Sequence, residues 1–419
     1  MHLLLEALGN PHRHFRSVHV AGTKGKGSTA ALLASALRES GYRTGCYSSP
    51  HVVSMEERVR VDDQEIEVEE LDALLAAAAP AAERLRPRGL SHFELLTAVA
   101  FGHFAAKGVE VAVVEAGLGG ARDATNVFNA GDLAASVITP VGRDHLEALG
   151  GDLRGVALAK AGVMKAGRPL VLAPQPEAEA ERLILEQGAR EGGLKSFLTP
   201  PTLSLRALTE FPPLGLEGPH QLQNASTALC AAAALKQWSA FDRLSLDAIG
   251  RGFRLAWLPG RFQRCRLGDG PLVILDGAHT PEAARFLVET LRSAVPAGSP
   301  VALVLAMAAD KDIGGVCAEL GKLQPVATFP VEVDVAGARA RSAAPGTIMA
   351  NWQFNVPRPG RIMIQPSLMA AVDRAKVELA AASAMASEKG AEKAGVILLT
   401  GSMHIAGAAL RQLPLEPAV

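Results

Sequence analysis

A glycine-rich turn near the start of the chain has the residue types of a phosphate-binding site. Its residues are Gly22, Thr23, Lys24, Gly25, Lys26, Gly27 and Ser28. Glycine backbone amides and a helix N-terminus together attract a triphosphate, and Lys26 adds a mobile positive charge. Ser28 can cap the helix or support the phosphates and their metal. The structural alternative is an ordinary glycine turn followed by a serine cap.

A carboxylate is expected at the end of a second apolar segment. Glu115 follows residues 109–114, and glycines stand at 117, 119 and 120. A buried carboxylate is costly unless it is paired or bound to a cation. Magnesium prefers oxygen ligands and keeps phosphate oxygens and waters beside one or two carboxylates. Pairing with Arg122 or a lysine is the structural alternative.

Other ionisable residues carry weaker signals when each is taken alone. His145 follows an apolar run at 135–139, but a lone histidine is as often the hydrogen-bond partner of a neighbouring group. The Tyr47–His51 segment, YSSPH, reads alone as a polar loop. Lys160 and Lys165 lie in a helix-like segment, where solvated surface lysines are the default.

A second polar cluster follows a strand in the second half of the chain. Asp276 and His279 come directly after residues 272–275. They could orient an incoming amine, or act as a capping aspartate and a core histidine. Arg261 follows a Pro-Gly turn and could reach a phosphate or cover a hinge.

The elements that position these residues alternate between strand and helix patterns, which is typical of an α/β fold with a mostly parallel sheet. The expected strands are 17–20, 109–114, 135–139, 169–173, 272–275, 301–305 and 396–399, and the first expected helix is 28–40. Ligands collect at the carboxyl ends of the strands in such sheets. The polar clusters described above lie at those ends.

The length of 419 residues predicts two domains. The turn-rich segment 257–261 separates the two strand series, so we expect a first domain at 1–258, which contains the glycine-rich turn, and a second domain at 259–419. The Ala-rich stretches 76–82 and 380–386 are interpreted as helix surface. Residues 326–366 contain five prolines with poor periodicity, which predicts an irregular insertion.

The overall charge excludes some classes of partner. Lys and Arg number 42 against 43 Asp and Glu, so neither nucleic acid nor an anionic membrane is an expected partner. Four widely spaced cysteines predict free thiols in a reducing compartment. The segment 1–15 lacks the apolar core of a secretory signal. We expect a cytoplasmic monomer, with mitochondria as the alternative if a transit peptide precedes this start.

Ten segments, in order, resemble the folylpolyglutamate synthase and dihydrofolate synthase branch of the Mur ligase family. They are HVAGTKGKGST, YSSPH, HFELLTAVAF, VVEAGLGGARDATNV, ITPVGRDH, AKAGVMKAG, HQLQNA, PGRFQ, LDGAH and LLTGS. The resemblance covers nearly the whole chain. It implies a three-layer, P-loop-type N-terminal ATPase domain and a smaller Rossmann-like C-terminal domain that ligates glutamate.

The resemblance also implies roles for individual residues. Lys26 would bind the ATP phosphates, with Ser49, Glu115 and His145 as magnesium ligands. Lys160 matches a lysine that is carbamoylated in the family, which would let it hold a second magnesium ion. Further matches are Asn224, Arg261 and Asp276 as nucleotide contacts, and His279 and Ser402 near the incoming glutamate. Asp276 and His279 are also expected to take part in catalysis, together with Lys26 and Lys160.

The implied reaction joins L-glutamate to 7,8-dihydropteroate through an acyl phosphate, with ATP as co-substrate. Addition of glutamates to a reduced folate, alone or in a bifunctional enzyme, is the alternative. Three positions depart from the family pattern: Thr280 replaces an asparagine, Arg122 lies one position late, and Ala159 replaces an acidic residue. None removes Lys26 or a proposed metal ligand, so an active enzyme is expected.

Two other classes of protein remain as alternatives. A P-loop kinase is less favoured because Val20 stands where the standard loop has its first glycine. Such a kinase would release a phosphorylated product without an amino acid. A catalytically inactive folate-binding or scaffold protein would not turn over ATP, and the intact set of Lys26, Ser49, Glu115 and His145 argues against this alternative.

Overall fold

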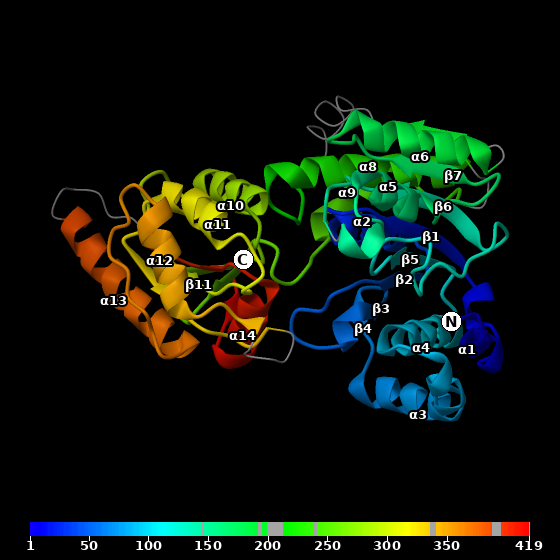
Figure 1. Ribbon diagram of the computed structural model, residues 1–419, viewed down its shortest axis with the longest axis horizontal. Helices are drawn as coiled ribbons and strands as arrows, with labels where there is room; N and C mark the ends of the chain where they lie inside the picture. Colours follow the sequence, from blue (N-terminus) through cyan, green and yellow to red (C-terminus); the bar gives the residue numbers. More distant parts are fainter. Residues whose placement is uncertain are drawn as a thin grey trace. The chain divides into compact units, whose positions relative to one another are not determined.

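The computed structural model describes residues 1–144, 146–191, 195–198, 213–237, 241–335, 341–387 and 395–418. The described residues form two compact units (Figure 1). The first comprises Met1–Leu216 and Gln221–Trp257, and the second Glu217–His220 and Leu258–Val419. Each unit contains a sheet dominated by parallel strands, so the predicted α/β class is confirmed.

The described strands of the first unit form an eight-stranded sheet in the order β4-β3-β2-β5-β1-β6-β7-β8. Their bounds are β1 Arg16–Ala21, β2 Thr44–Tyr47, β3 Val59–Val61, β4 Gln64–Glu65, β5 Val111–Glu115, β6 Leu133–Ile138, β7 Pro169–Leu172 and β8 Lys195–Leu198. Strands β3 and β4 are antiparallel, and the other six run parallel. Because β1 lies between β5 and β6, its carboxyl end is surrounded by the ends of both neighbours.

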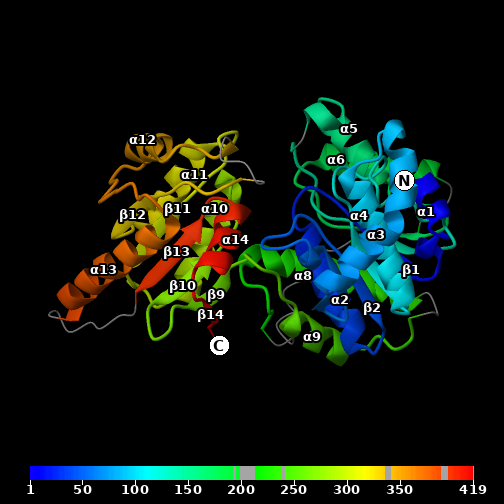
Figure 2. The ribbon, with the colours of Figure 1, turned by 90° about the horizontal axis from the view of Figure 1, so that it is seen from below.

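Helices cover both faces of this sheet. They are α1 His2–Ala7, α2 Lys26–Glu39, α3 Val68–Leu85, α4 His92–Ala106, α5 Leu153–Ala161, α6 Ala178–Arg190, α8 Pro219–Gln237 and α9 Leu246–Leu255. Helices α2, α8 and α9 group on one side of the sheet, and α1 and α3 to α6 on the other (Figure 2). Central strand β5 is buried on both faces, as a parallel strand between helical layers should be.

The second unit has a six-stranded sheet among the described residues, in the order β12-β11-β13-β10-β9-β14. Its strands are β9 Gln263–Arg266, β10 Leu272–Leu275, β11 Val301–Leu305, β12 Ala327–Pro330, β13 Val396–Thr400 and β14 Glu416–Pro417. Its helices are α10 Pro281–Ala294, α11 Ile313–Leu320, α12 Pro345–Asn355, α13 Leu368–Ser387 and α14 Met403–Gln412. Helices α10, α11 and α12 share one face of the sheet, and α13 and α14 lie on the other (Figure 2).

The expectation that residues 326–366 form an irregular insertion is wrong. This range contains β12 and α12, and two of its five prolines stand where these elements begin or end. Pro330 is the last residue of β12, and Pro345 is the first residue of α12. Proline is favoured at the first helical position because its missing N–H has no partner there in any case. Pro330 and Pro345 therefore mark element boundaries and do not break the fold.

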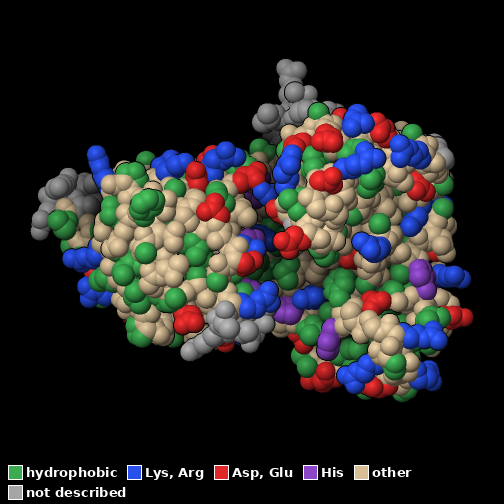
Figure 3. Space-filling model, viewed as in Figure 1, with side chains coloured by type: hydrophobic (Ala, Val, Ile, Leu, Met, Phe, Trp, Pro, Cys, Tyr) green, Lys and Arg blue, Asp and Glu red, His purple; other side chains and the backbone are tan. Residues whose placement is uncertain are grey.

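The distribution of charged side chains and the state of the cysteines match what the composition predicts. On the face drawn in Figure 3, acidic and basic side chains are interspersed over each unit. Cys46, Cys230, Cys265 and Cys317 are free thiols, as predicted. Among the residues that the structure describes, no helix is both long and apolar enough to cross a membrane.

Candidate active site

The phosphate-type turn joins β1 to α2. Gly25 is the N-cap of α2 with a φ of 81°, a left-handed conformation that favours glycine. The backbone N–H groups of Thr23 and Lys24 both donate to the Pro140 carbonyl, at 2.9 and 3.2 Å, which ties the turn to the end of β6. Since α2 begins at Lys26, Ser28 lies inside the helix and the serine-cap alternative is wrong.

Glycine is required where this turn passes its neighbours. A Cβ at Gly22 would lie 1.8 Å from Thr139 Oγ1, and one at Gly25 would lie 2.3 Å from Asn224 Oδ1. Both distances are far below van der Waals contact. The turn is therefore packed closely against β6 on one side and helix α8 on the other.

Glu115 lies beside this turn, at the carboxyl end of β5. Its side chain is about 5% exposed, and its Oε1 is 3.7 Å from Lys26 Nζ. Its Oε2 accepts a hydrogen bond of 3.1 Å from the backbone N–H of Ser49. The pairing with a lysine that was weighed as an alternative is thus present. It places the carboxylate, the lysine and the start of the 48–58 loop within one small volume.

Lys160 is not a solvated surface lysine, so that default interpretation is wrong. It is 4% exposed, and its Nζ donates a 2.7 Å hydrogen bond to the Gly22 carbonyl. Burial, together with the nearby positive charge of Lys26, lowers the pKa of Lys160 to about 7, and Asp144 acts in the opposite direction. A lysine with such a pKa is substantially neutral, and therefore nucleophilic, near pH 7.

Asn224 reaches the same turn from α8. Its side chain is buried, and its Nδ2 donates to Gln221 Oε1 at 2.8 Å. This hydrogen bond holds the amide in one orientation, with Oδ1 facing Gly25. The first unit therefore brings together the glycine turn, Glu115, Lys160 and Asn224, with Ser49 held through its backbone. His145 lies outside the described residues.

The donor atoms fit a magnesium–nucleotide complex. Glu115 supplies a carboxylate and Ser49 a hydroxyl, both hard oxygen ligands. In the described ranges, no group of three His, Cys, Asp or Glu residues is arranged to hold a metal ion. A single carboxylate beside a phosphate-type turn suits an ion that keeps waters and phosphate oxygens as its other ligands.

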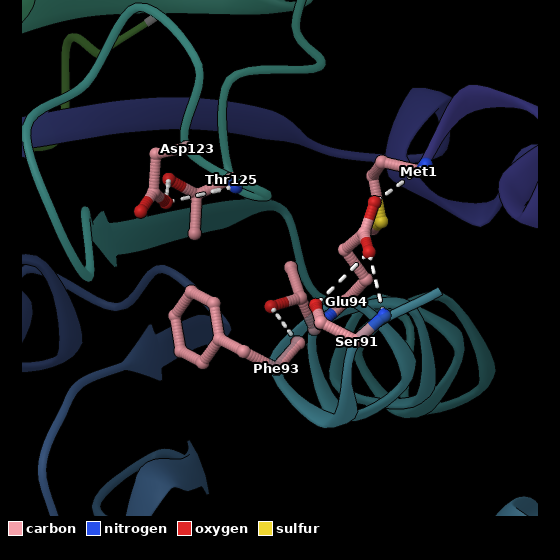
Figure 4. Close-up of polar contacts among 7 residues, drawn as sticks. Met1, Ser91, Phe93, Glu94, Asp123 and Thr125 are labelled. Atoms are coloured by element: carbon pink, nitrogen blue, oxygen red, sulfur yellow. Dashed lines mark hydrogen bonds and ion pairs between the residues drawn. The ribbon is translucent and has the colours of Figure 1, made fainter. Parts of the chain in front are cut away.

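Sequence reasoning missed a polar network behind the GLGG segment. Asp123 Oδ1 accepts hydrogen bonds from the N–H (3.0 Å) and hydroxyl (2.6 Å) of Thr125, while Oδ2 accepts one from the Leu118 N–H (2.8 Å). Gly117 passes close to both Asp123 and the Phe93 ring, since a Cβ there would lie 2.7 Å from the ring. Figure 4 shows Phe93 at the start of α4 and Asp123 on the facing loop. The sequence DATN at residues 123–126 could have indicated this turn, because an aspartate side chain often accepts hydrogen bonds from nearby backbone N–H groups.

The same view shows how α4 begins. Ser91 and Glu94 form a capping box, in which the Ser91 hydroxyl accepts from the Glu94 N–H and the Glu94 carboxylate accepts from the Ser91 N–H (Figure 4). The N-terminal amine of Met1 also donates to Glu94, at 2.8 Å. These bonds fix the first turn of α4 and with it the backbone that carries Phe93.

In the second unit, Asp276 holds two loops in place. Its Oδ2 accepts from the Phe262 N–H and its Oδ1 from the Ala278 N–H, both at 2.8 Å. Burial raises the pKa of Asp276 above its ordinary value, while the Arg261 guanidinium lowers it. Arg261 Nη1 lies 3.1 Å from Met403 Sδ. Asp276 therefore ties two loops together and is not a helix cap, because α10 is capped by Thr280.

The two predicted glutamate-site residues lie after neighbouring strands. His279 follows β10, and its Nδ1 is 2.8 Å from the Gly277 carbonyl. Ser402 follows β13 and caps α14, because its hydroxyl accepts from the Ile405 N–H. Strands β10 and β13 are paired, so their carboxyl ends are adjacent. Thr280, where the family pattern has asparagine, caps α10.

Comparison with known proteins identifies relatives over the whole chain. The family model described as "Mur ligase, glutamate ligase domain" matches residues 260–403. The dihydrofolate synthase/folylpolyglutamate synthase of Mycobacterium tuberculosis is 34% identical over 97% of this chain and 88% of its own length. That of Bacillus subtilis is 35% identical over 74% of this chain and 75% of its own.

Solved structures that resemble this chain belong to the same family of enzymes. A Mycobacterium tuberculosis folylpolyglutamate synthase complexed with ADP and AMPPCP has a TM-score of 0.83 and 28% identity, over 100% of this chain and 95% of that one. Escherichia coli FolC in complex with DHPP and ADP has a TM-score of 0.75 and 28% identity, over 98% and 91%. A bifunctional Yersinia pestis enzyme with AMPPNP and a Mn ion has the same TM-score and identity, over 97% and 91%. The chain belongs to the dihydrofolate synthase/folylpolyglutamate synthase family of Mur ligases and is an acid–amino-acid ligase.

Proposed function

We propose that this protein uses ATP to join L-glutamate to the carboxylate of 7,8-dihydropteroate. The observation that carries the proposal is the convergence of Lys26, Glu115 and Lys160 on the Gly22–Ser28 turn. Two lysines near a carboxylate at a helix N-terminus suit a triphosphate and its cation. The bound nucleotides, DHPP and Mn ion of the solved relatives support this choice of ligands.

The first step transfers the γ-phosphoryl group of ATP to the substrate carboxylate. A carboxylate oxygen forms the new P–O bond, the bond to the β-phosphate oxygen breaks, and ADP leaves. Lys26 lies 3.7 Å from Glu115, so it is positioned to exchange that partner for phosphate oxygens when nucleotide binds. Magnesium would offset charge on the transferring group, held by Glu115, Ser49 and, as predicted from the sequence, His145.

Lys160 has a second proposed role that follows from its burial. With a pKa of about 7, its neutral amine can add to CO₂, forming an N–C bond and releasing one proton. The product is a carbamate anion on a side chain that already lies against Gly22. A carbamate would supply further oxygen ligands for a second magnesium ion beside the same phosphates.

The second step uses the second unit. The glutamate amine attacks the carbonyl of the acyl phosphate, a C–N bond forms, and inorganic phosphate leaves. We assign His279 and Ser402 to the glutamate, because they follow adjacent strand ends and stand at helix N-termini that favour its carboxylates. Asp276 organises the loops from which Arg261 and His279 project. Arg261, Asp276 and Asn224 are assigned to the nucleotide.

Addition of glutamate to a reduced folate is the second candidate. It uses the same phosphate transfer and the same incoming amine, and it differs in the acid that is activated. Both activities appear in the names of the Mycobacterium tuberculosis and Bacillus subtilis relatives. The two acids share the pteridine and aminobenzoyl groups, so one pocket can accept both.

Substitution of the turn lysine tests the chemistry. Lys26→Ala should abolish glutamate-dependent ADP release while circular dichroism stays that of the wild type. Lys107→Ala is the control, because Lys107 lies at the end of α4, outside the turn, and its exposed side chain pairs with Glu70. Wild-type turnover by Lys26→Ala would show that phosphate transfer does not depend on the lysine of this turn.

A further inference from the structure

The loop that carries Ser49 contains a buried glutamate to which neither the sequence reasoning nor the proposed mechanism assigns a role. This loop, residues 48–58, connects β2 to β3. Glu57 is 6% exposed, although its side chain ends in a carboxyl group, and it lies in a short 3₁₀ turn. Burying a carboxylate costs free energy unless hydrogen bonds replace its lost water. Its partners therefore indicate what it does.

Glu57 accepts three backbone hydrogen bonds from the middle of its own loop. Oε2 accepts from the N–H of Val52 at 2.7 Å. Oε1 accepts from the N–H groups of Val53 and Ser54, at 2.6 and 2.9 Å. Hydrogen bonds to an ionised acceptor are about twice as strong as those between neutral groups. The carboxylate thus fixes three consecutive peptide units that belong to no helix or strand.

Arg58 fixes the first part of the same loop. Its backbone carbonyl accepts a 3.1 Å hydrogen bond from the Ser48 N–H, which extends the β2–β3 pairing by one residue. Its Nε donates to His51 Nδ1 at 3.0 Å, so the proton of a neutral His51 is on Nε2. Between Ser48 and His51 stands Ser49, whose N–H donates to Glu115.

These contacts restrain Ser49 from both sides. On one side, Ser48 is paired with Arg58. On the other, the chain from Val52 onwards is held by Glu57. A ligand on an unrestrained loop must be ordered when the ion binds, and that entropic cost lowers affinity. A ligand that is already held avoids this cost.

We propose that Glu57 is a positioning residue that holds the Ser49 loop in the conformation needed to bind a divalent cation beside Glu115. It does not contact the reacting atoms; it acts through residues 52–54. The inference rests on the proposed function for the identity of the ion. It goes beyond that function by predicting that cation affinity depends on a residue that is not itself a ligand.

The test compares Glu57→Gln with Glu56→Gln in the full-length protein. The two positions are adjacent and lose the same charge, but Glu56 takes no part in the three loop hydrogen bonds. An amide can keep one acceptor oxygen, while its NH₂ group faces an N–H donor. Two readouts are needed: exchange protection of the amides at 52–54, and Mn²⁺ affinity by electron paramagnetic resonance with AMPPCP present.

For Glu57→Gln, we expect faster exchange at 52–54 and about tenfold weaker Mn²⁺ binding, about 1.4 kcal/mol. Glu56→Gln should match the wild type in both readouts. Glu57→Asp retains the charge and should recover part of the affinity, which separates positioning from general loss of structure. Raising the Mg²⁺ concentration should restore ligation in both Glu57 variants.

Several results would overturn the inference. Wild-type Mn²⁺ affinity in Glu57→Gln despite faster exchange would show that the carboxylate only stabilises the loop. Equally weakened Mn²⁺ binding in Glu56→Gln would show a general effect of charge. If the wild type did not bind Mn²⁺ in the presence of AMPPCP, there would be no cation site for Glu57 to position. A wild type that binds Mn²⁺ with AMPPCP but ligates no glutamate would refute the proposed function, and the binding comparison would still decide the role of Glu57.

Discussion

Substitution of Gly25 by alanine tests whether the turn is shaped by its contact with α8. Gly25 has a φ of 81°, and an added Cβ would lie 2.3 Å from Asn224 Oδ1. The left-handed backbone costs a residue with a side chain about 1–2 kcal/mol. Overpacking a buried contact costs about 1–3 kcal/mol more. Gly25→Ala should therefore lower the free energy of unfolding by about 2–5 kcal/mol.

The chain offers a matched control. Gly41 has nearly the same φ, 82°, but a Cβ there would meet nothing within 4 Å. Gly41→Ala should therefore cost about 1–2 kcal/mol, the backbone part alone. Urea unfolding measures both free energies, and titration with AMPPCP measures nucleotide affinity. We expect affinity to fall at least tenfold, about 1.4 kcal/mol, in Gly25→Ala and to be unchanged in Gly41→Ala.

A double variant separates the steric contact from the backbone cost. Asn224→Ala removes the atoms that the new Cβ would meet, so part of the Gly25→Ala penalty should disappear in the combined variant. A coupling free energy of about 1 kcal/mol or more is expected for two residues in contact. Equal costs for Gly25→Ala and Gly41→Ala, with unchanged AMPPCP affinity, would refute the reasoning.

Two further predictions concern buried charges. Lys160 has a pKa of about 7 in the folded protein against an ordinary 10.5, so its burial should destabilise the fold fully below pH 7 and progressively less up to about pH 10.5. Lys160→Met should consequently raise the free energy of unfolding more at pH 6.5 than at pH 9 in CO₂-free buffer; an equal gain at both would contradict the burial argument. Asp276→Asn removes one carboxylate acceptor, so amide exchange at Phe262 or Ala278 should accelerate by the equivalent of about 1–3 kcal/mol. Unchanged protection at both amides would show that Asp276 does not hold these loops.

The regular elements could be predicted where apolar runs are short and bounded by turn residues. Residues 272–275 and 301–305 are strands over the predicted ranges. Residues 326–366 were mispredicted because a proline count does not say whether each proline interrupts an element or bounds it. Pro345 opens α12, a position in which proline is favoured.

The site was less predictable, because long-range contacts decide it. The local pattern predicts that Lys160 is a surface lysine, but in the fold its Nζ donates to the carbonyl of Gly22, 138 residues earlier in the chain. The approach of Asn224 to Gly25 likewise depends on where α8 packs. The role of Glu57 could not be predicted, because its partners are backbone N–H groups, which residue types do not reveal. The resemblance to the family singled out Lys160 and Asn224, which local pattern could not, but it did not single out Glu57.

The central claim is that the chain activates a pteroate-type acid and joins it to glutamate. The most direct measurement is the mass of the products formed from ATP, Mg²⁺ and L-glutamate with 7,8-dihydropteroate or tetrahydrofolate supplied separately. We predict a dihydropteroate product heavier by one glutamate less one water, with ADP release that depends on glutamate. A heavier product from tetrahydrofolate alone would favour the second candidate. ADP release without either ligated product would contradict the proposed ligation.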